Sequence, residues 1–155
     1  MLYPSILKKL ESYCAYQERS HRDIRLKLKL LNVAEESIEE YIVYLIEHHY
    51  LNEERFACSF ARGKHNYKKW GKTRIINELK LHGVSNYNIK TALNEIKEVD
   101  YLKNFNDLAE KEWNNTKESH PQKKKRKIGD FLFRKGYESY LILTKIEELS
   151  SSNGQ

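Results

Sequence analysis

The sequence predicts an all-α protein in which three tandem three-helix repeats stack into an elongated array that can curve. Three observations lead to this fold class. Long segments rich in Leu, Ile, Lys and Glu contain no proline, because Pro4 lies near one end and Pro121 in an expected linker. Apolar residues recur at the spacing of one helix face. The same apolar pattern also occurs three times along the 155 residues.

Six apolar positions define the repeat, and their spacing is identical in each copy. The copies begin at Ile24, Ile75 and Ile128, which are 51 and 53 residues apart (75 − 24 and 128 − 75). Such a match in three places indicates one structural unit used three times. The further positions are Leu28, Val33, Ile38, Ile42 and Leu45; Leu79, Val84, Ile89, Leu93 and Ile96; and Leu132, Tyr137, Ile142, Ile146 and Leu149.

A tight turn is expected at the same place in each copy. Gly83 and Gly136 stand at this place in the second and third copies, and Asn32 holds it in the first. Glycine, and after it asparagine, most readily adopts the left-handed backbone that ends a helix. Each copy is therefore predicted to contain two helices joined by a tight turn.

A further helix is expected before each pair, over residues 6–17, 52–64 and 101–117. Ser20 with Asp23, and Asn52, are predicted to cap helix starts. The repeats would then span residues 1–50, 51–99 and 100–149, with an exposed connection at 114–126 and a disordered tail at 150–155. Repeats this small bury little apolar surface alone, so neighbours are expected to stack.

Composition favours a soluble cytoplasmic protein with an anionic partner. The net charge is +6, and no apolar run approaches the roughly 20 residues of a membrane span. The N-terminus lacks the pattern of a signal peptide. Cys14 and Cys58 are isolated, so they are interpreted as buried small hydrophobic residues rather than a disulfide.

Basic side chains gather in the second and third copies, where Tyr67 and Trp70 lie among them. These residues are predicted to contact a protein partner or DNA, the alternative being solvated helix faces that only aid solubility. For residues 123–127 the alternative is a charged tether, because five adjacent cations cannot share one helix face. The predicted binding residues are Arg62, Lys64, Lys68, Lys69, Lys72, Arg74 and Lys80, and Lys123, Lys124, Lys125, Arg126, Lys127, Arg134 and Lys135.

Structural roles are predicted for Trp70, Gly71, Gly83 and Gly136. Gly71, near a helix start, would allow close approach to another helix, and Trp70 would pack across a repeat boundary, the alternative being that Trp70 contacts a partner. No metal-binding histidine or cysteine spacing and no glycine-rich phosphate loop occurs. The sequence therefore predicts no metal, no cofactor and no enzymatic activity.

A helix-turn-helix that reads DNA bases is the main alternative function. Gly83 would form the turn, and Ser85, Asn86, Asn88 and Lys90 would face the groove. The equivalent segment of the first copy instead carries Glu35, Glu36, Glu39, Glu40 and Glu47, which phosphates would repel. The shared pattern is therefore better explained by packing. A helical adaptor for another acidic protein is a third hypothesis.

The middle copy carries a distinctive set of residues: Leu51, Glu53, Arg55-Phe56-Ala57, Trp70-Gly71, Arg74-Ile75, Leu79, Gly83-Val84 and Ile89. With these residues it resembles the RecX family of bacterial recombinase regulators. The segments "ERSHRDIRLKL" in the first copy and "KIGDFLFRKGYESYLI" in the third are similar to the other repeats of that family. The resemblance covers roughly residues 10–149. Asn32 departs from the usual glycine, and the 123–127 run is more basic than the family pattern.

This resemblance implies a non-enzymatic monomer of tandem three-helix repeats, active in recombination, DNA repair and the SOS response. Its implied partner is the RecA recombinase and its filament on single-stranded DNA. The protein would lie in the filament groove, with direct but weak DNA binding. It would inhibit ATP hydrolysis, strand exchange and co-protease activity.

Overall fold

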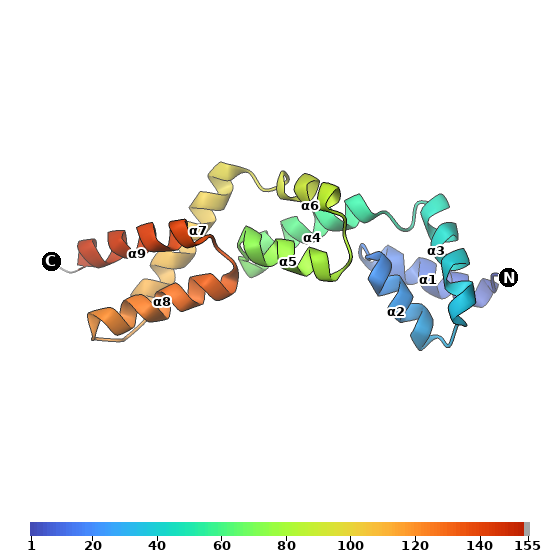
Figure 1. Cartoon of the computed structure of the whole chain (residues 1–155), viewed down its shortest axis with the longest axis horizontal. Coiled ribbons are helices and arrows are strands. Elements are labelled where there is room, and N and C mark those ends of the chain that lie inside the picture. The colour runs from blue at the N-terminus through green and yellow to red at the C-terminus, as the bar shows by residue number, and fades with distance from the viewer. Residues whose placement is uncertain (154–155) are drawn as a thin grey trace. The chain divides into compact units, whose positions relative to one another are not determined.

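The computed structural model describes residues 1–153, and these residues form helices without any strand. The all-α prediction is therefore confirmed for the described part of the chain (Figure 1). In order, the elements are α1 (Pro4–Tyr16), α2 (His21–Leu30), the short 3-10 helix η1 (Glu35–Ser37), α3 (Ile38–Glu47), α4 (Glu53–Lys68), α5 (Lys72–Leu81), α6 (Asn86–Leu93), α7 (Glu98–Asn115), α8 (Pro121–Lys135) and α9 (Ser139–Asn153).

The helices group into two compact units. The first contains Met1–Phe60 and Glu78–Leu93, and the second contains Ala61–Asn77 and Asn94–Gln155. Helices α4 and α5 contribute to both units, so each unit combines an outer repeat with part of the middle one. The two units do not coincide with the three predicted repeats. The repeat boundaries 1–50, 51–99 and 100–149 therefore remain a proposal, which describes how the order of helices recurs along the chain.

The turn that ends α2, α5 and α8 has one geometry in all three copies. Asn32, Gly83 and Gly136 have φ angles of 60°, 76° and 98°, as the turn pattern predicts. The next amide donates to the carbonyl five residues earlier, from Val33 to Leu28, Val84 to Leu79 and Tyr137 to Leu132. This is the Schellman motif, in which the two apolar residues joined by that bond also touch. It explains why these two positions belong to the repeat.

The repeated apolar positions form the cores of the two units. All of them are buried except Val33, Leu93 and Ile146, which are partly buried. The first unit encloses a continuous cluster of buried residues from α1, α2, α3 and the α3–α4 connection, namely Leu10, Cys14, Ile24, Leu28, Ile38, Tyr41, Ile42, Leu45 and Leu51. The apolar positions that recur at helical spacing in the sequence are therefore the positions that the fold buries.

Several helix ends differ from the sequence-based expectation. The predicted connection at 114–126 is wrong in extent, because α7 reaches Asn115 and α8 starts at Pro121. Proline suits the first turn of a helix, where its missing N–H has no intrahelical partner. Helix α9 also continues through residues 150–153 of the expected tail, whose last two residues lie outside the described part. Cys58 is only partly buried, unlike Cys14.

The capping box predicted from Ser20 and Asp23 is confirmed. The Ser20 hydroxyl accepts from the Asp23 amide, and the Asp23 carboxylate accepts from the Ser20 amide, both at 3.0 Å. Asn52 likewise accepts from the Arg55 amide at 2.8 Å. These bonds satisfy amides that have no intrahelical partner at the start of α2 and α4.

Consecutive repeats are joined by equivalent contacts in each unit. In the first unit, Ser20 before α2 lies 2.8 Å from the His82 ring nitrogen after α5. In the second, the Gly71 amide before α5 donates to the Lys135 carbonyl at the end of α8. Gly71 follows Ser20 by 51 residues and Lys135 follows His82 by 53, which are the repeat spacings. The start of one central helix therefore meets the end of the next.

Candidate protein- and nucleic-acid-binding surface

The candidate surface begins where α4 ends. Lys69 follows the last residue of α4 and adopts a left-handed conformation with φ of 61°. Its amide donates to the His65 carbonyl, and the Trp70 amide donates to the Lys64 carbonyl, each at 3.1 Å. A left-handed lysine is uncommon, and the sequence pattern did not indicate it. This turn leads the chain directly into Trp70 and Gly71.

The segment after Trp70 docks on the end of α8 through backbone atoms. The Gly71 amide donates to the Lys135 carbonyl at 2.7 Å, and the Thr73 amide donates to the Gly136 carbonyl at 3.0 Å. A Cβ at Gly71 would lie 2.3 Å from the Gly136 oxygen. A Cβ at Gly136 would lie equally close to the Arg74 Cβ. The absence of two side chains therefore permits this contact.

Side chains reinforce the same contact. Lys135 donates from Nζ to the Lys68 carbonyl at 3.0 Å, and the Tyr137 hydroxyl donates to the Lys69 carbonyl at 2.9 Å. Arg74 donates to the Arg134 carbonyl at 3.2 Å. Basic residues from two repeats are therefore held together around Trp70. We call this group the Trp70 basic cluster: Lys64, Lys68, Lys69, Lys72, Arg74, Arg134 and Lys135.

Two cations of the cluster lie close to the Trp70 ring. The Arg74 guanidinium carbon is 4.0 Å from the Trp70 ring, and the Lys64 ammonium is 5.0 Å from it. Both distances are in the range of cation–π attraction. A partly buried aromatic ring flanked by cations is a feature of surfaces that bind nucleic acid backbones and unstacked bases.

A buried hydrogen-bond network centred on His65 stabilises the turn at Lys69 and Trp70. His65 is 1% exposed, and its Nδ1 donates to the Trp70 carbonyl at 2.9 Å. Its Nε2 accepts from the Asn104 amide at 3.0 Å, so the neutral ring satisfies both partners. Burial lowers the pKa of His65, and the nearby Lys69 and Lys72 charges lower it further. His65 is therefore a neutral support for the turn.

Tyr101 and Tyr137 also support the cluster, although the sequence pattern identifies Tyr137 only as an apolar anchor. The Tyr101 hydroxyl accepts from the Lys72 amide at 2.9 Å and donates to the Glu138 carboxylate. Burial raises the pKa of both phenols. Both therefore remain neutral donors near pH 7, and the α5 start is fixed by uncharged groups.

Two predicted binding residues of the middle repeat do not join the Trp70 basic cluster. Arg62 pairs with Glu95 across the second unit, so its charge is balanced. Lys80 belongs to the first unit. Within the cluster itself, Lys72 lies 3.5 Å from Glu98. Its charge is therefore partly balanced as well.

The run from Lys123 to Lys127 forms a separate basic surface. It lies in the first turns of α8, and Lys125 precedes Arg134 by nine residues, roughly 14 Å along a helix. Lys124 packs 4.3 Å from the Trp113 ring, while Lys125 and Lys127 lie 3.8 Å and 3.3 Å from Glu147 and Glu118. The run is therefore helical and partly paired, which corrects the interpretation of a tether.

Comparison with known proteins identifies the family. A family model for the second three-helix domain of RecX matches residues 52–93, and one for its third three-helix domain matches residues 98–145. The chain belongs to the RecX family. These matches cover α4–α6 and most of α7–α9. Both surfaces therefore lie in RecX domains.

RecX proteins of known sequence and structure are similar over most of this chain. The "Regulatory protein RecX" of Bacillus cereus (strain B4264) is 30% identical over 138 residues, or 89% of this chain and 51% of the relative. That of Bacillus mycoides (strain KBAB4) gives the same identity and coverage. The chain therefore spans about half the length of these relatives. They are named regulatory proteins, and the family is not one of enzymes.

Two solved RecX structures share the fold. The crystal structure of RecX from Lactobacillus salivarius is 28% identical, with a TM-score of 0.76 over 93% of this chain and 94% of that one. A second RecX crystal structure, 23% identical, has a TM-score of 0.79 over 91% of this chain and 73% of that one. At that identity, the second likeness shows the fold alone.

The structure argues against base reading by α6 in this RecX chain. Asn88 donates to the Glu53 carboxylate, and the Ser85 amide donates to the same oxygen at 3.2 Å. The Ser85 hydroxyl accepts from the Asn88 amide, which caps the helix. Hydrogen bonds that lower the pKa of Glu53 keep this carboxylate charged despite its partial burial. Two of the four proposed reading residues thus have structural partners.

Among residues 1–153, no group of three or more His, Cys, Asp or Glu side chains is arranged to hold a metal ion. None of the helices described in the structure is long and apolar enough to cross a membrane.

Proposed function

We propose that this chain is a negative modulator of RecA that binds the recombinase and lies in the groove of its filament on single-stranded DNA. Membership of the RecX family supports the proposal. In the molecule itself, the Trp70 basic cluster carries it. A cluster of seven basic residues, two of which contact an aromatic ring, suits a partner that presents phosphates, carboxylates or both.

The proposed mechanism is occupancy of the groove. Binding across neighbouring RecA protomers would stabilise a filament state that turns over poorly, which lowers ATP hydrolysis, strand exchange and co-protease activity. Tandem repeats suit this mechanism because they present more than one basic surface along the chain. The net charge of +6 adds long-range attraction to an anionic filament. The chain would act in the cytoplasm as a monomer without a cofactor.

The two basic surfaces of the second unit suggest a division of labour. The Trp70 basic cluster combines cations with an aromatic ring, which favours contact with DNA. The 123–127 run is exposed at Lys123, Arg126 and Lys127, and the ring that Lys124 contacts, Trp113, is buried. We therefore assign the run to an acidic surface of the recombinase.

The single-stranded-DNA-dependent ATPase of the cognate RecA tests the proposal. Adding this protein at a stoichiometric amount is expected to lower the rate strongly. The double variant Lys68→Glu/Arg134→Glu is expected to inhibit far less, because both side chains are exposed while their carbonyls keep the α8 contacts. Unchanged ATPase activity with the wild-type protein would reject the proposal.

Matched charge reversals separate the two surfaces. Lys123→Glu/Arg126→Glu changes the 123–127 run by the same charge as the first double variant. Lys111→Glu is the control, because Lys111 is exposed on α7 and belongs to neither surface. If the control loses as much inhibition as the double variants, overall charge rather than either surface is responsible.

A further inference from the structure

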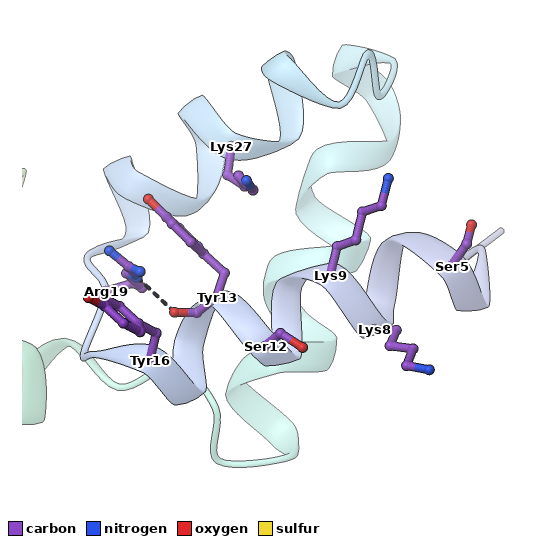
Figure 2. Close-up of a pocket in the computed structure, with 8 residues that line it drawn as sticks. All are labelled: Ser5, Lys8, Lys9, Ser12, Tyr13, Tyr16, Arg19 and Lys27. Atoms are coloured by element: carbon purple, nitrogen blue, oxygen red, sulfur yellow. Dashed lines mark hydrogen bonds between the residues drawn. The ribbon is translucent and has the colours of Figure 1, made fainter.

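A basic and aromatic hollow lies against α1 and α2 of the first unit, and none of the predicted binding residues lines it. It has a volume of about 670 Å³ and is lined by Ser5, Lys8, Lys9, Ser12, Tyr13, Tyr16, Arg19 and Lys27. Figure 2 shows that α1 supplies most of these side chains, the α1–α2 connection supplies Arg19, and α2 supplies Lys27. Ser5, Lys9, Ser12 and Tyr16 follow helical spacing, so they form a stripe on one face of α1, roughly 16 Å long.

The cations of this hollow are not neutralised by nearby acids. Among the described residues, no carboxylate lies within ion-pairing distance of Lys8, Lys9, Arg19 or Lys27. The acidic residues of this region are engaged elsewhere. Glu11 accepts from the Tyr44 hydroxyl at 2.9 Å, and Glu18 pairs with Arg55. The hollow therefore carries an uncompensated positive charge.

Arg19 is fixed against an aromatic ring in the hollow. Its guanidinium carbon lies 3.6 Å from the Tyr13 ring, and its Nε donates to the Tyr13 carbonyl at 2.8 Å (Figure 2). Lys27 approaches the same ring at 5.1 Å. The cost of ordering these cations is therefore largely met before a ligand arrives.

Tyr16 offers a second ring, which is open to solvent. Its side chain is 83% exposed, and the Arg19 guanidinium carbon lies 5.8 Å from its centre. A solvated tyrosine beside fixed cations is suited to stacking an unpaired base while the cations hold the adjoining phosphates. Duplex DNA has no unpaired base to stack, and an acidic peptide needs no exposed ring.

We propose that this hollow binds single-stranded nucleic acid, with one base on Tyr16 and phosphates at Arg19, Lys8 and Lys9. The site reads no sequence, because stacking and charge accept every base. This binding site does not depend on the proposed action on RecA, because only this chain and a single-stranded nucleic acid take part in the binding.

The repeat supports the assignment through an equivalent position. Tyr67 follows Tyr16 by 51 residues, the spacing of the first two copies, and is 86% exposed. The Tyr13 and Arg19 pair corresponds to Lys64 and Trp70, which form a cation–π pair with the cation and ring exchanged. An exposed tyrosine midway in sequence between the two members of such a pair therefore recurs in both repeats. Each unit would then carry one binding site for single-stranded nucleic acid.

Fluorescence anisotropy with labelled oligo-dT, in the absence of RecA, tests the hollow directly. The measurement uses the Lys68→Glu/Arg134→Glu variant, so that binding at the Trp70 basic cluster is weakened. In this background Tyr16→Ala is expected to weaken binding by about five-fold or more, the lower range for loss of one stacked base. Tyr16→Phe is expected to stay within about two-fold, because the ring is retained.

Two control variants test whether any exposed residue gives the same effect. Tyr87→Ala removes another exposed tyrosine of the first unit, and Lys29→Ser removes an exposed lysine of α2 outside the hollow. Lys9→Ser is expected to weaken binding and reduce its salt dependence more than Lys29→Ser. No oligo-dT binding in the background variant, or equal losses in Tyr16→Ala and Tyr87→Ala, would overturn the proposal.

Photo-cross-linking provides a readout of position. A single-stranded oligonucleotide carrying 5-iododeoxyuridine is irradiated with the wild-type protein, and the adducts are mapped by mass spectrometry. An adduct on Tyr16 or Tyr13 is expected. Adducts confined to Tyr67 and Trp70 would place all strand binding in the second unit and contradict the assignment, whatever the outcome of the ATPase experiment.

Discussion

The Gly71 amide lies 2.7 Å from the Lys135 carbonyl, and this hydrogen bond joins the middle repeat to the third through backbone atoms. The equivalent contact in the first unit uses the Ser20 and His82 side chains. Backbone atoms cannot move aside as a flexible side chain can. The second unit therefore tolerates less variation at this contact, which leads to the first prediction.

Gly71→Ala is expected to destabilise the second unit by about 1–3 kcal/mol, because its Cβ would meet the backbone of Gly136 and Tyr137. Urea unfolding measures the change in the free energy of unfolding. Gly63→Ala is the matched control in helix α4, where a Cβ has no neighbour within 4 Å among the described residues. This control is expected to stabilise by about 0.5–1 kcal/mol. Equal stabilities of the two variants would contradict the prediction.

Asparagine is expected to replace glycine at one turn and not at the other. Gly83→Asn should cost about 1 kcal/mol, because Asn32 occupies the same left-handed turn in the first repeat and no described atom lies near the added Cβ. Gly136→Asn should cost clearly more, because Arg74 backbone atoms block the Cβ. Thermal unfolding of both variants measures the difference. A smaller loss in Gly136→Asn than in Gly83→Asn would be inconsistent with the turn geometry.

Stability is expected to fall in acid partly through His65. Its pKa is lowered in the fold from the usual 6.5, so below about pH 6.5 the unfolded chain binds more protons than the folded one. The contribution is therefore fully present above pH 6.5 and is lost as the pH falls toward the folded value. His65→Gln should be less stable at pH 7.5 but lose less stability on going to pH 5.5. An equal loss in both proteins would argue against this role.

Phosphate contacts at the Trp70 basic cluster are expected to show in the salt dependence of DNA binding. Lys68→Ala and Arg134→Ala should each weaken oligo-dT binding and reduce the slope of log K against log salt by about 0.7, the value for one single-strand phosphate. Lys111→Ala is the control and should leave the slope unchanged. Anisotropy titrations between low and moderate salt measure it. Unchanged slopes in all three variants would contradict the proposal that the Trp70 basic cluster contacts DNA.

Cys14 is expected to resist alkylation in the folded protein. Burial raises the pKa of its thiol to about 11, so little thiolate exists at pH 8. In a Cys58→Ser background, iodoacetamide should label Cys14 slowly in buffer and quickly in urea, as followed by intact mass. Similar labelling rates in the two conditions would indicate that the first unit opens readily.

The sequence itself predicted the features that depend on neighbouring residues. Helical periodicity identified the buried faces at Ile24, Ile75 and Ile128, and the Gly or Asn turns followed from left-handed backbone preference. The Ser20 capping box was readable for the same reason, since its partner is three residues away. The start of α8 was missed because the lysine-rich segment lacks an apolar signal before Ile128.

For the candidate site, the sequence supplied the residue types, and the tertiary structure decided which of them act together. Charge density indicated both basic segments, yet only packing brings Arg134 and Lys135 to Trp70 and leaves the 123–127 run at the other end of α8. Packing also binds Asn88 to Glu53 and gathers Tyr16, Arg19 and Lys27 around one hollow. Helix propensity and capping act over a few residues, whereas these contacts join separate helices. Their positions therefore depend on how the helix faces bury one another.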